Sequence, residues 1–113
     1  DRVRLLLMNW WDPMSPNMIG RIFDQVPFPG WALEHAAITE TSLMMYVAPE
    51  LVRQDLIADV GKTDPGFCYR YPIDKDSIPS NGVLARSSSA QKGQWIVEDV
   101  VSNISDFIRR EFC

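Results

Sequence analysis

The sequence predicts an α/β protein, because a strand-like apolar run is followed by segments with helical periodicity. Residues 2–9 are apolar almost without interruption, as in a strand that is covered on both faces. The end of the chain carries its apolar side chains at helical spacing instead, which is typical of a helix that covers a sheet. These side chains are Ile96, Val97, Val100, Val101, Ile104, Phe107 and Ile108.

The 113 residues suffice for one small domain, 1–113. A fully buried strand at the start of the chain needs neighbouring strands, however, and the remaining sequence offers few. We therefore expect another chain to complete the domain.

Two adjacent tryptophans follow the predicted strand. Neighbouring side chains of a strand point to opposite faces, so we expect Trp10 to pack in the core and Trp11 to line a cleft. That cleft would lie at the carboxyl end of the strand, where open α/β sheets bind ligands. Both side chains could also simply fill space.

A short helix is predicted from Pro16 to Val26, with Ser15 as N-cap and proline at its first position. The segment 27–31 must be irregular, because its two prolines lack N–H donors and restrict the residues before them. This aromatic loop could form the wall of a small-molecule pocket or pack on another subunit.

A central helix is predicted from Ile38 to Val47, capped by Thr39 or Thr41. A shorter helix follows from Pro49 to near Gly61. The apolar face of the central helix would consist of Leu43, Met44 and Val47.

Residues 62–89 lack any periodic pattern and predict a long irregular arm or interface loop. The last helix then starts at Ser88-Ser89-Ala90-Gln91, which has the pattern of a capping box, and runs to Phe112.

Composition excludes several classes of partner. A net charge of −4 and a pI near 4.8 argue against nucleic acid, which requires a basic face. No apolar run approaches the roughly 18 residues of a membrane span, and we see no signal-peptide pattern. Cys68 and Cys113 do not resemble a disulfide framework, so we expect a cytoplasmic protein.

The single histidine, His35, lies between Glu34 and Glu40 and four residues after Trp31. It precedes the predicted central helix, whose N-terminus favours negative charge. A proton donor at this position could face an anion or a developing oxyanion. The alternative is a buried structural histidine at a loop–helix junction.

Several sequence blocks resemble the C-terminal half of the creatininase (creatinine amidohydrolase) family. The most specific are Gly30-Trp31, Glu34-His35 and Glu40-Thr41-Ser42-Leu43-Met44. Asn9-Trp10-Trp11-Asp12 resembles the family's strand that ends in Trp-Asp, and Ala48-Pro49-Glu50-Leu51-Val52 resembles its Tyr-Pro-Asp-Leu-Val. The resemblance implies a three-layer α/β/α creatininase-like fold, to which this chain supplies the C-terminal half.

The resemblance also implies a divalent-metal hydrolase that opens small cyclic amides. It assigns catalytic roles to His35, as acid or oxyanion stabiliser, and to Glu40, and substrate binding to Trp11, Trp31 and Glu34. No metal ligand is implied in this chain. The metal, Zn or alternatively Mn, would be bound mainly by a second chain that carries the N-terminal half.

One departure concerns the substrate. The family's acidic residue after Gly-Trp is Ala32 here, which argues against creatinine and favours a planar, less charged substrate. The bond cleaved could be an amide, or an aryl ether or ester.

Two hypotheses of different class follow. In the first, the chain is a subunit of a split hydrolase, with about six copies of the pair or a trimer of heterodimers. In the second, it is a non-catalytic subunit that stabilises the metal-bearing chain. A third, a self-sufficient binding module, is disfavoured by the buried opening strand.

Overall fold

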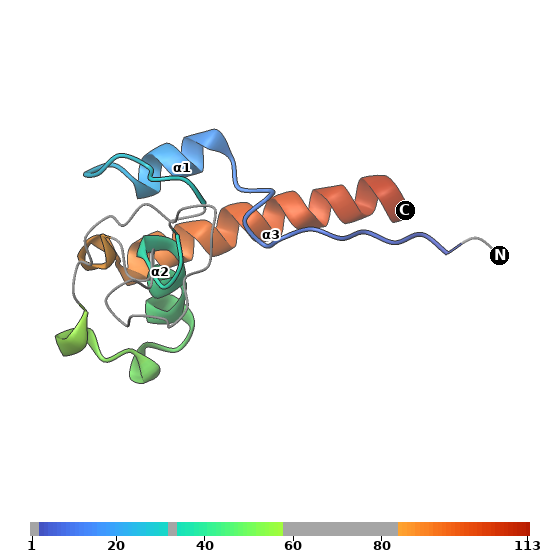
Figure 1. The fold of residues 1–113 in the computed structure, drawn as a ribbon. Helices are drawn as coiled ribbons and strands as arrows, with labels where there is room; N and C mark the ends of the chain where they lie inside the picture. The colour runs from blue at the N-terminus through green and yellow to red at the C-terminus, as the bar shows by residue number, and fades with distance from the viewer. Residues whose placement is uncertain (1–2, 32–33, 58–83) are drawn as a thin grey trace, which may run out of the picture.

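The computed structural model describes residues 3–31, 34–57 and 84–113. These residues form three α-helices, α1 (Pro16–Ile22), α2 (Ile38–Val47) and α3 (Ala90–Phe112). They also form three 3-10 turns, η2 (Pro49–Leu51), η3 (Gln54–Leu56) and η5 (Ala85–Ser87). The long helix α3 organises the chain: α1 and α2 gather at its N-terminal half, and the first residues run extended along its C-terminal half (Figure 1).

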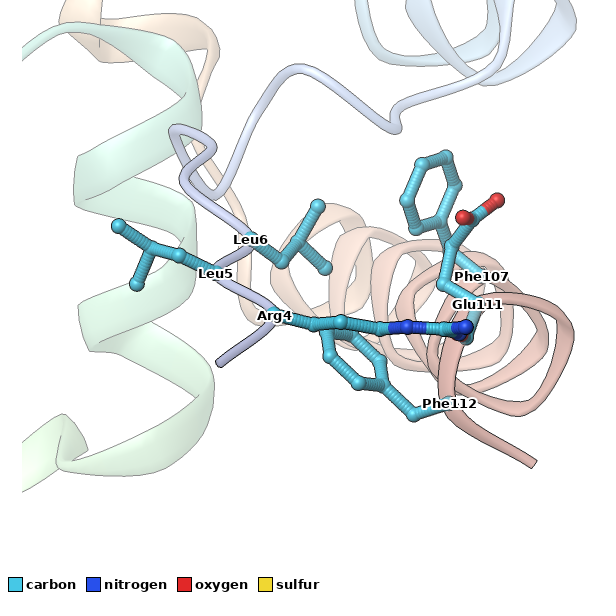
Figure 2. Close-up of a pocket in the computed structure, with 6 residues that line it drawn as sticks. All are labelled: Arg4, Leu5, Leu6, Phe107, Glu111 and Phe112. Carbon is cyan, nitrogen blue, oxygen red and sulfur yellow. The ribbon is translucent and has the colours of Figure 1, made fainter. Parts of the chain in front are cut away.

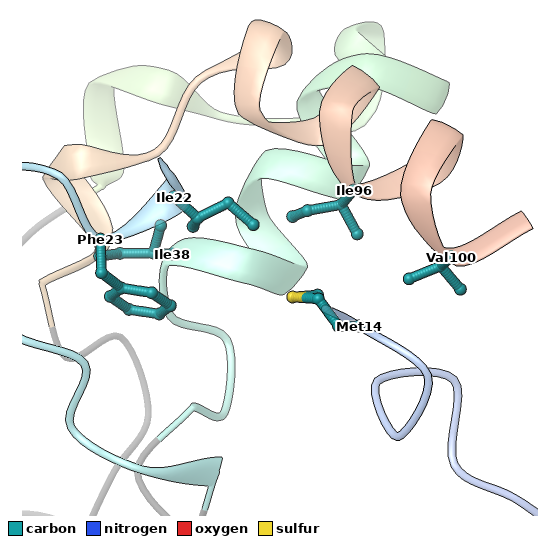
Figure 3. Close-up of a cluster of buried hydrophobic side chains, with 6 residues drawn as sticks. All are labelled: Met14, Ile22, Phe23, Ile38, Ile96 and Val100. Carbon is teal, nitrogen blue, oxygen red and sulfur yellow. The ribbon is translucent and has the colours of Figure 1, made fainter. Parts of the chain in front are cut away.

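The hydrophobic core lies between α1, α2 and the first half of α3 (Figure 3). Its buried members are Met14, Ile22, Phe23, Ile38, Ile96 and Val100. Trp10 packs against this cluster, as predicted. The radius of gyration is 16.4 Å, against about 13 Å for a compact domain of this length, so the chain is only partly collapsed around its core.

The start of α1 confirms the prediction at Ser15. Its hydroxyl accepts a hydrogen bond from the Met18 N–H at 3.2 Å, and Pro16 holds the first helical position. The same Ser15 donates from its N–H and its hydroxyl to the Asp99 carboxylate of α3, at 3.0 and 3.1 Å. The helix ends at Ile22, four residues before the predicted end, and its last turn also contacts α3, where the Arg21 guanidinium lies 3.6 Å from the Trp95 ring centroid.

Helix α2 buries a different face from the predicted one. Ile38, Thr39 and Ser42 are buried, whereas Met44 and Val47 are exposed. The cause lies on α3, where Gly93 lets the backbones approach so closely that a Cβ there would lie 2.0 Å from the Ser42 carbonyl oxygen. Because Gly93 and Ser42 are both small, the two helices pack closely and the polar face of α2 becomes buried.

The first residues of the chain do not form the predicted strand. Residues 3–9 are extended but have no strand assignment, because a strand needs a hydrogen-bonded neighbour and the described residues provide none. For the same reason α3 covers no sheet within the described residues, and Val101 and Ile108 of its predicted stripe are exposed. The three-layer α/β/α arrangement stays a prediction.

Two further predictions are corrected. The helix predicted from Pro49 is replaced by the separate 3-10 turns η2 and η3, and residues 58–61 lie outside the described part. The N-cap of α3 is Ser89, which accepts from the Lys92 N–H at 3.2 Å, and not Ser88. Ser88 donates to the Ile38 carbonyl oxygen of α2 instead, at 3.3 Å.

The predicted arm, residues 62–89, is described only from residue 84 onward, where it forms η5 and the N-cap of α3. Of the two cysteines, Cys113 is exposed and free, and Cys68 lies outside the described residues. Within the described part of the chain, no helix is both long and apolar enough to cross a membrane.

Candidate functional site

Trp11 and Trp31, predicted to bind substrate, lie against each other. Their ring centroids are 6.0 Å apart and the planes are inclined by 26°. Trp10 meets Trp11 edge-on on one side, and Phe28 meets Trp31 edge-on on the other. Because carbon atoms pack at about 3.5 Å, a flat molecule between two rings needs about 7 Å. The 6.0 Å between the two ring centroids therefore leaves no room for a flat molecule between them.

The residues that lead into α2 are held by hydrogen bonds. The Glu34 N–H donates to the Trp31 carbonyl oxygen at 3.1 Å. The Glu34 carboxylate is buried, and its Oε2 accepts from both the N–H and the hydroxyl of Thr39, at 3.0 and 2.6 Å. Glu34 thus caps α2 from outside the helix. The predicted caps Thr39 and Thr41 are wrong, because the N-cap is Ala37 and makes no side-chain bond.

Burial raises the pKa of the Glu34 carboxyl above its ordinary value of 4.5, and the bonds from Thr39 oppose that shift. The second oxygen, Oε1, is buried and has no hydrogen-bond partner among the described residues. A buried carboxylate oxygen without a donor is costly. Glu34 therefore has capacity for one more bond, from a group that the described residues do not supply.

The second carboxylate, Glu40, holds the backbone next to the histidine. Its Oε2 accepts from the Ala36 N–H at 2.6 Å, and the Thr41 hydroxyl donates to the Ala36 carbonyl oxygen at 3.2 Å. These bonds hold Ala36 in the left-handed region, with φ of 48°, which is uncommon for a residue with a side chain. Strain of this kind is characteristic of functional loops.

His35 itself is exposed, and no side-chain bond ties its ring to the other described residues. The alternative of a buried structural histidine is therefore wrong. The nearby N–H groups of Ala36 and Thr39 are already taken by the two carboxylates.

The described residues do not fit a metal centre of their own. They contain no group of three or more His, Cys, Asp or Glu side chains that could hold a metal ion. The chain's one histidine is exposed, and Glu34 is committed to Thr39. Ala32, which replaces the acidic residue after Gly-Trp, lies outside the described residues.

Residues 6–108 match the family model described as creatininase, creatinine amidohydrolase. The chain belongs to the creatininase family. It is 34% identical to the creatinine amidohydrolase of Pseudomonas putida, over 96% of this chain and 43% of that protein.

Solved creatininase structures agree with this assignment. A manganese form of creatininase superposes with a TM-score of 0.84 at 33% identity, over 96% of this chain and 43% of that one. A mutant creatininase of Zn-Zn type gives 0.83 at 33% identity with the same coverage. A mutant complexed with creatine also gives 0.83 at 33% identity, over 96% and 44%. The chain spans less than half the length of these creatininases.

The sequence analysis overlooked two residues near His35. Thr39 is the buried partner of Glu34, and Ala36 has a strained backbone. The spacing from Glu34 to Thr39 could have indicated the first, because it places a carboxylate opposite the free N–H groups of a helix start. No pattern in the sequence indicates the positive φ of Ala36.

Proposed function

We propose that this chain supplies the substrate-side part of a divalent-metal hydrolase of the creatininase type. A partner chain carries the N-terminal, metal-binding half, and the pair assembles into a hetero-oligomer with about six copies of the pair. The observation that supports this most directly is His35, an exposed ring on a loop that is fixed on both sides by carboxylates. A loop held in this way preorganises a donor without burying it.

In this proposal His35 donates a proton to the leaving group or stabilises the oxyanion. Glu40 acts by fixing the Ala36 backbone and hence the direction of the histidine. A divalent metal bound mainly by the partner chain, Zn or alternatively Mn, would supply the hydrolytic water. Mn and Zn-Zn forms of creatininase support the choice of metal.

The substrate is a small planar molecule with an amide, or with an aryl ether or ester. The half-buried rings of Trp11 and Trp31 support this, because flat π-systems stack on such rings. We place the free Oε1 of Glu34 toward a substrate donor. This role requires the loop to open, since Glu34 is buried in the chain by itself.

The experiment compares His35→Ala with Asn17→Ala, an exposed residue of α1, in the complex as purified from its source. Turnover is assayed on a panel of small cyclic amides, creatinine included, and of aryl esters. We expect His35→Ala to lower kcat by about 10²–10⁴-fold without changing the mass of the complex, and Asn17→Ala to match the natural protein. Unchanged turnover in His35→Ala would refute the role of the histidine.

The second candidate is a non-catalytic subunit that stabilises the metal-bearing chain. The contact between Trp11 and Trp31 favours it, because the two rings leave no gap for a ligand between them. Under this hypothesis His35→Ala and Trp31→Ala leave the turnover of the complex unchanged, whereas removal of the whole chain lowers the stability of its partner.

A further inference from the structure

The first residues of the chain have the side-chain alternation of a strand. Val3, Leu5 and Leu7 are 94%, 89% and 91% exposed, whereas on the alternate positions Leu6 and Met8 are half-buried and Arg4 is exposed. Figure 2 shows Leu6 pointing toward Phe107 of α3 and Leu5 pointing away from that helix. We call residues 3–8 the edge segment. One of its faces packs on this chain, and the other presents three apolar side chains to the outside.

The edge segment is attached to α3 only by side chains. The Arg4 guanidinium donates to the Glu111 carbonyl oxygen at 2.6 Å. The edge segment borders a cavity of about 390 Å³ (Figure 2), lined by Arg4, Leu5, Leu6, Phe107, Glu111 and Phe112. This attachment keeps the segment extended and in one place.

The backbone of the edge segment is unpaired within the described residues, where no backbone hydrogen bond joins it to another segment. Each of its residues carries one N–H and one C=O group. An extended, apolar segment with a free backbone is the template that another strand pairs with.

The comparisons indicate what covers this surface. Creatininases that superpose on 96% of this chain are more than twice as long, since the chain covers only 43% of them. Residues 1–113 therefore supply less than half of that fold, and the larger part of the fold is the counterpart that this segment would pack against. A second copy of this chain would not provide that part.

We propose that the edge segment pairs as a β-strand with a strand of a partner chain that carries the missing part of the creatininase domain. Val3, Leu5 and Leu7 become buried against that chain. The proposal rests on the partner chain of the proposed function and adds the surface and the mode by which it binds.

Substitution of the outward face tests the surface. Leu5→Asp combined with Leu7→Asp changes two side chains that are exposed in the chain by itself, so α1, α2 and α3 should form as before. The matched control is Met44→Asp with Val47→Asp, which changes two exposed apolar residues of α2. Circular dichroism of each variant checks that the helix content is retained.

Native mass spectrometry of the protein purified untagged from its source gives the first readout, with the second chain identified by peptide sequencing. We expect a complex with a chain that matches the rest of a creatininase. The two leucine substitutions should weaken that complex by about a hundredfold or more, and the α2 control should not weaken it. A monomer, a complex of this chain only with itself, one longer polypeptide, or an undiminished complex in Leu5→Asp with Leu7→Asp would each overturn the proposal.

Amide hydrogen exchange gives the second readout, because it reports backbone pairing. Amides of residues 3–8 should exchange fast in the chain alone and become protected in the complex. Docking through side chains alone would leave them fast and would refute the strand pairing. Neither readout uses turnover, so a complex that forms through the edge segment but hydrolyses nothing would refute the proposed function and leave this inference standing.

Discussion

The two halves of α3 differ in what they contact. In the first half, Gly93, Ile96 and Val100 are buried against α1 and α2. In the second half, Val101, Ile108 and Phe112 are exposed, and only the edge segment lies beside them. One apolar stripe runs along the whole helix in the sequence, yet this chain covers only half of it. An apolar stripe predicts that one face of a helix is buried, but it does not indicate which segment or chain covers that face.

The difference extends to the polar contacts. The first half of α3 is tied to the rest of the chain through Ser89, whose N–H donates to the Ser42 hydroxyl at 3.1 Å, and through Asp99, which binds Ser15. Beyond Asn103, which donates to the Pro13 carbonyl oxygen, the described contacts of α3 with other segments are Ile104 against the hydrophobic core, the bond from Arg4 and the apolar cavity. We therefore expect substitutions in the first half to affect stability much more than substitutions in the second.

The largest effect is expected for Gly93→Ala. The new Cβ would lie 2.0 Å from the Ser42 carbonyl oxygen and 2.7 Å from its carbon, and backbone atoms cannot move away without separating the helices. We expect the free energy of unfolding to fall by about 3 kcal/mol, measured by urea denaturation. The control is Gly20→Ala in α1, where nothing lies within 4 Å of the new atom and a gain of about 0.5–1 kcal/mol is expected. Equal effects would contradict the close approach of α2 and α3.

An intermediate effect is expected for Ser89→Ala. This substitution removes the hydroxyl that caps α3 by accepting from the Lys92 N–H, and loss of such a cap costs about 1 kcal/mol. Ser102→Ala, at an exposed position within the same helix, should stay within about 0.5 kcal/mol of the natural protein. Thermal unfolding of both variants measures the difference. If Ser102→Ala proved the more damaging, the assignment of the N-cap would be wrong.

Sequence patterns predicted the features that depend on neighbours in the chain. The cap at Ser15, the existence of α2 and the length of α3 were confirmed, because capping and periodicity are local. The position of His35 before a helix was also correct. Its exposure was not predicted, since it results from Glu34 and Glu40 folding back onto the Thr39 and Ala36 N–H groups.

The errors have a common cause in contacts between distant segments. The buried face of α2 depends on Gly93, fifty residues away in the chain, and no pattern within α2 reveals it. The strand predicted at residues 2–9 depends on a neighbour that the described residues do not contain. The prediction that its apolar run is buried is not met within the described residues, where Val3, Leu5 and Leu7 are exposed.

The smallest effects are expected for two ion pairs, one at each end of α3. Lys92 Nζ lies 3.1 Å from Asp24 Oδ1, and only 9% of the lysine side chain is exposed. Arg109 lies 2.9 Å from Asp106, and both side chains are about 70% exposed. Asp24→Asn leaves a buried ammonium without its carboxylate, so we expect a lower Tm at pH 7. Asp106→Asn should change stability by less than about 0.5 kcal/mol.

The pH dependence tests the Lys92–Asp24 pair further. The hydrogen bond from Lys92 lowers the pKa of Asp24 below its ordinary value of 3.8. A carboxylate with a lowered pKa in the folded state stabilises the protein above that ordinary value, and this contribution disappears as the pH falls through the lowered pKa. The Tm difference between Asp24→Asn and the natural protein should therefore shrink as the pH falls below 3.8. If that difference stayed constant as the pH fell, the contact with Lys92 would not lower the pKa of Asp24.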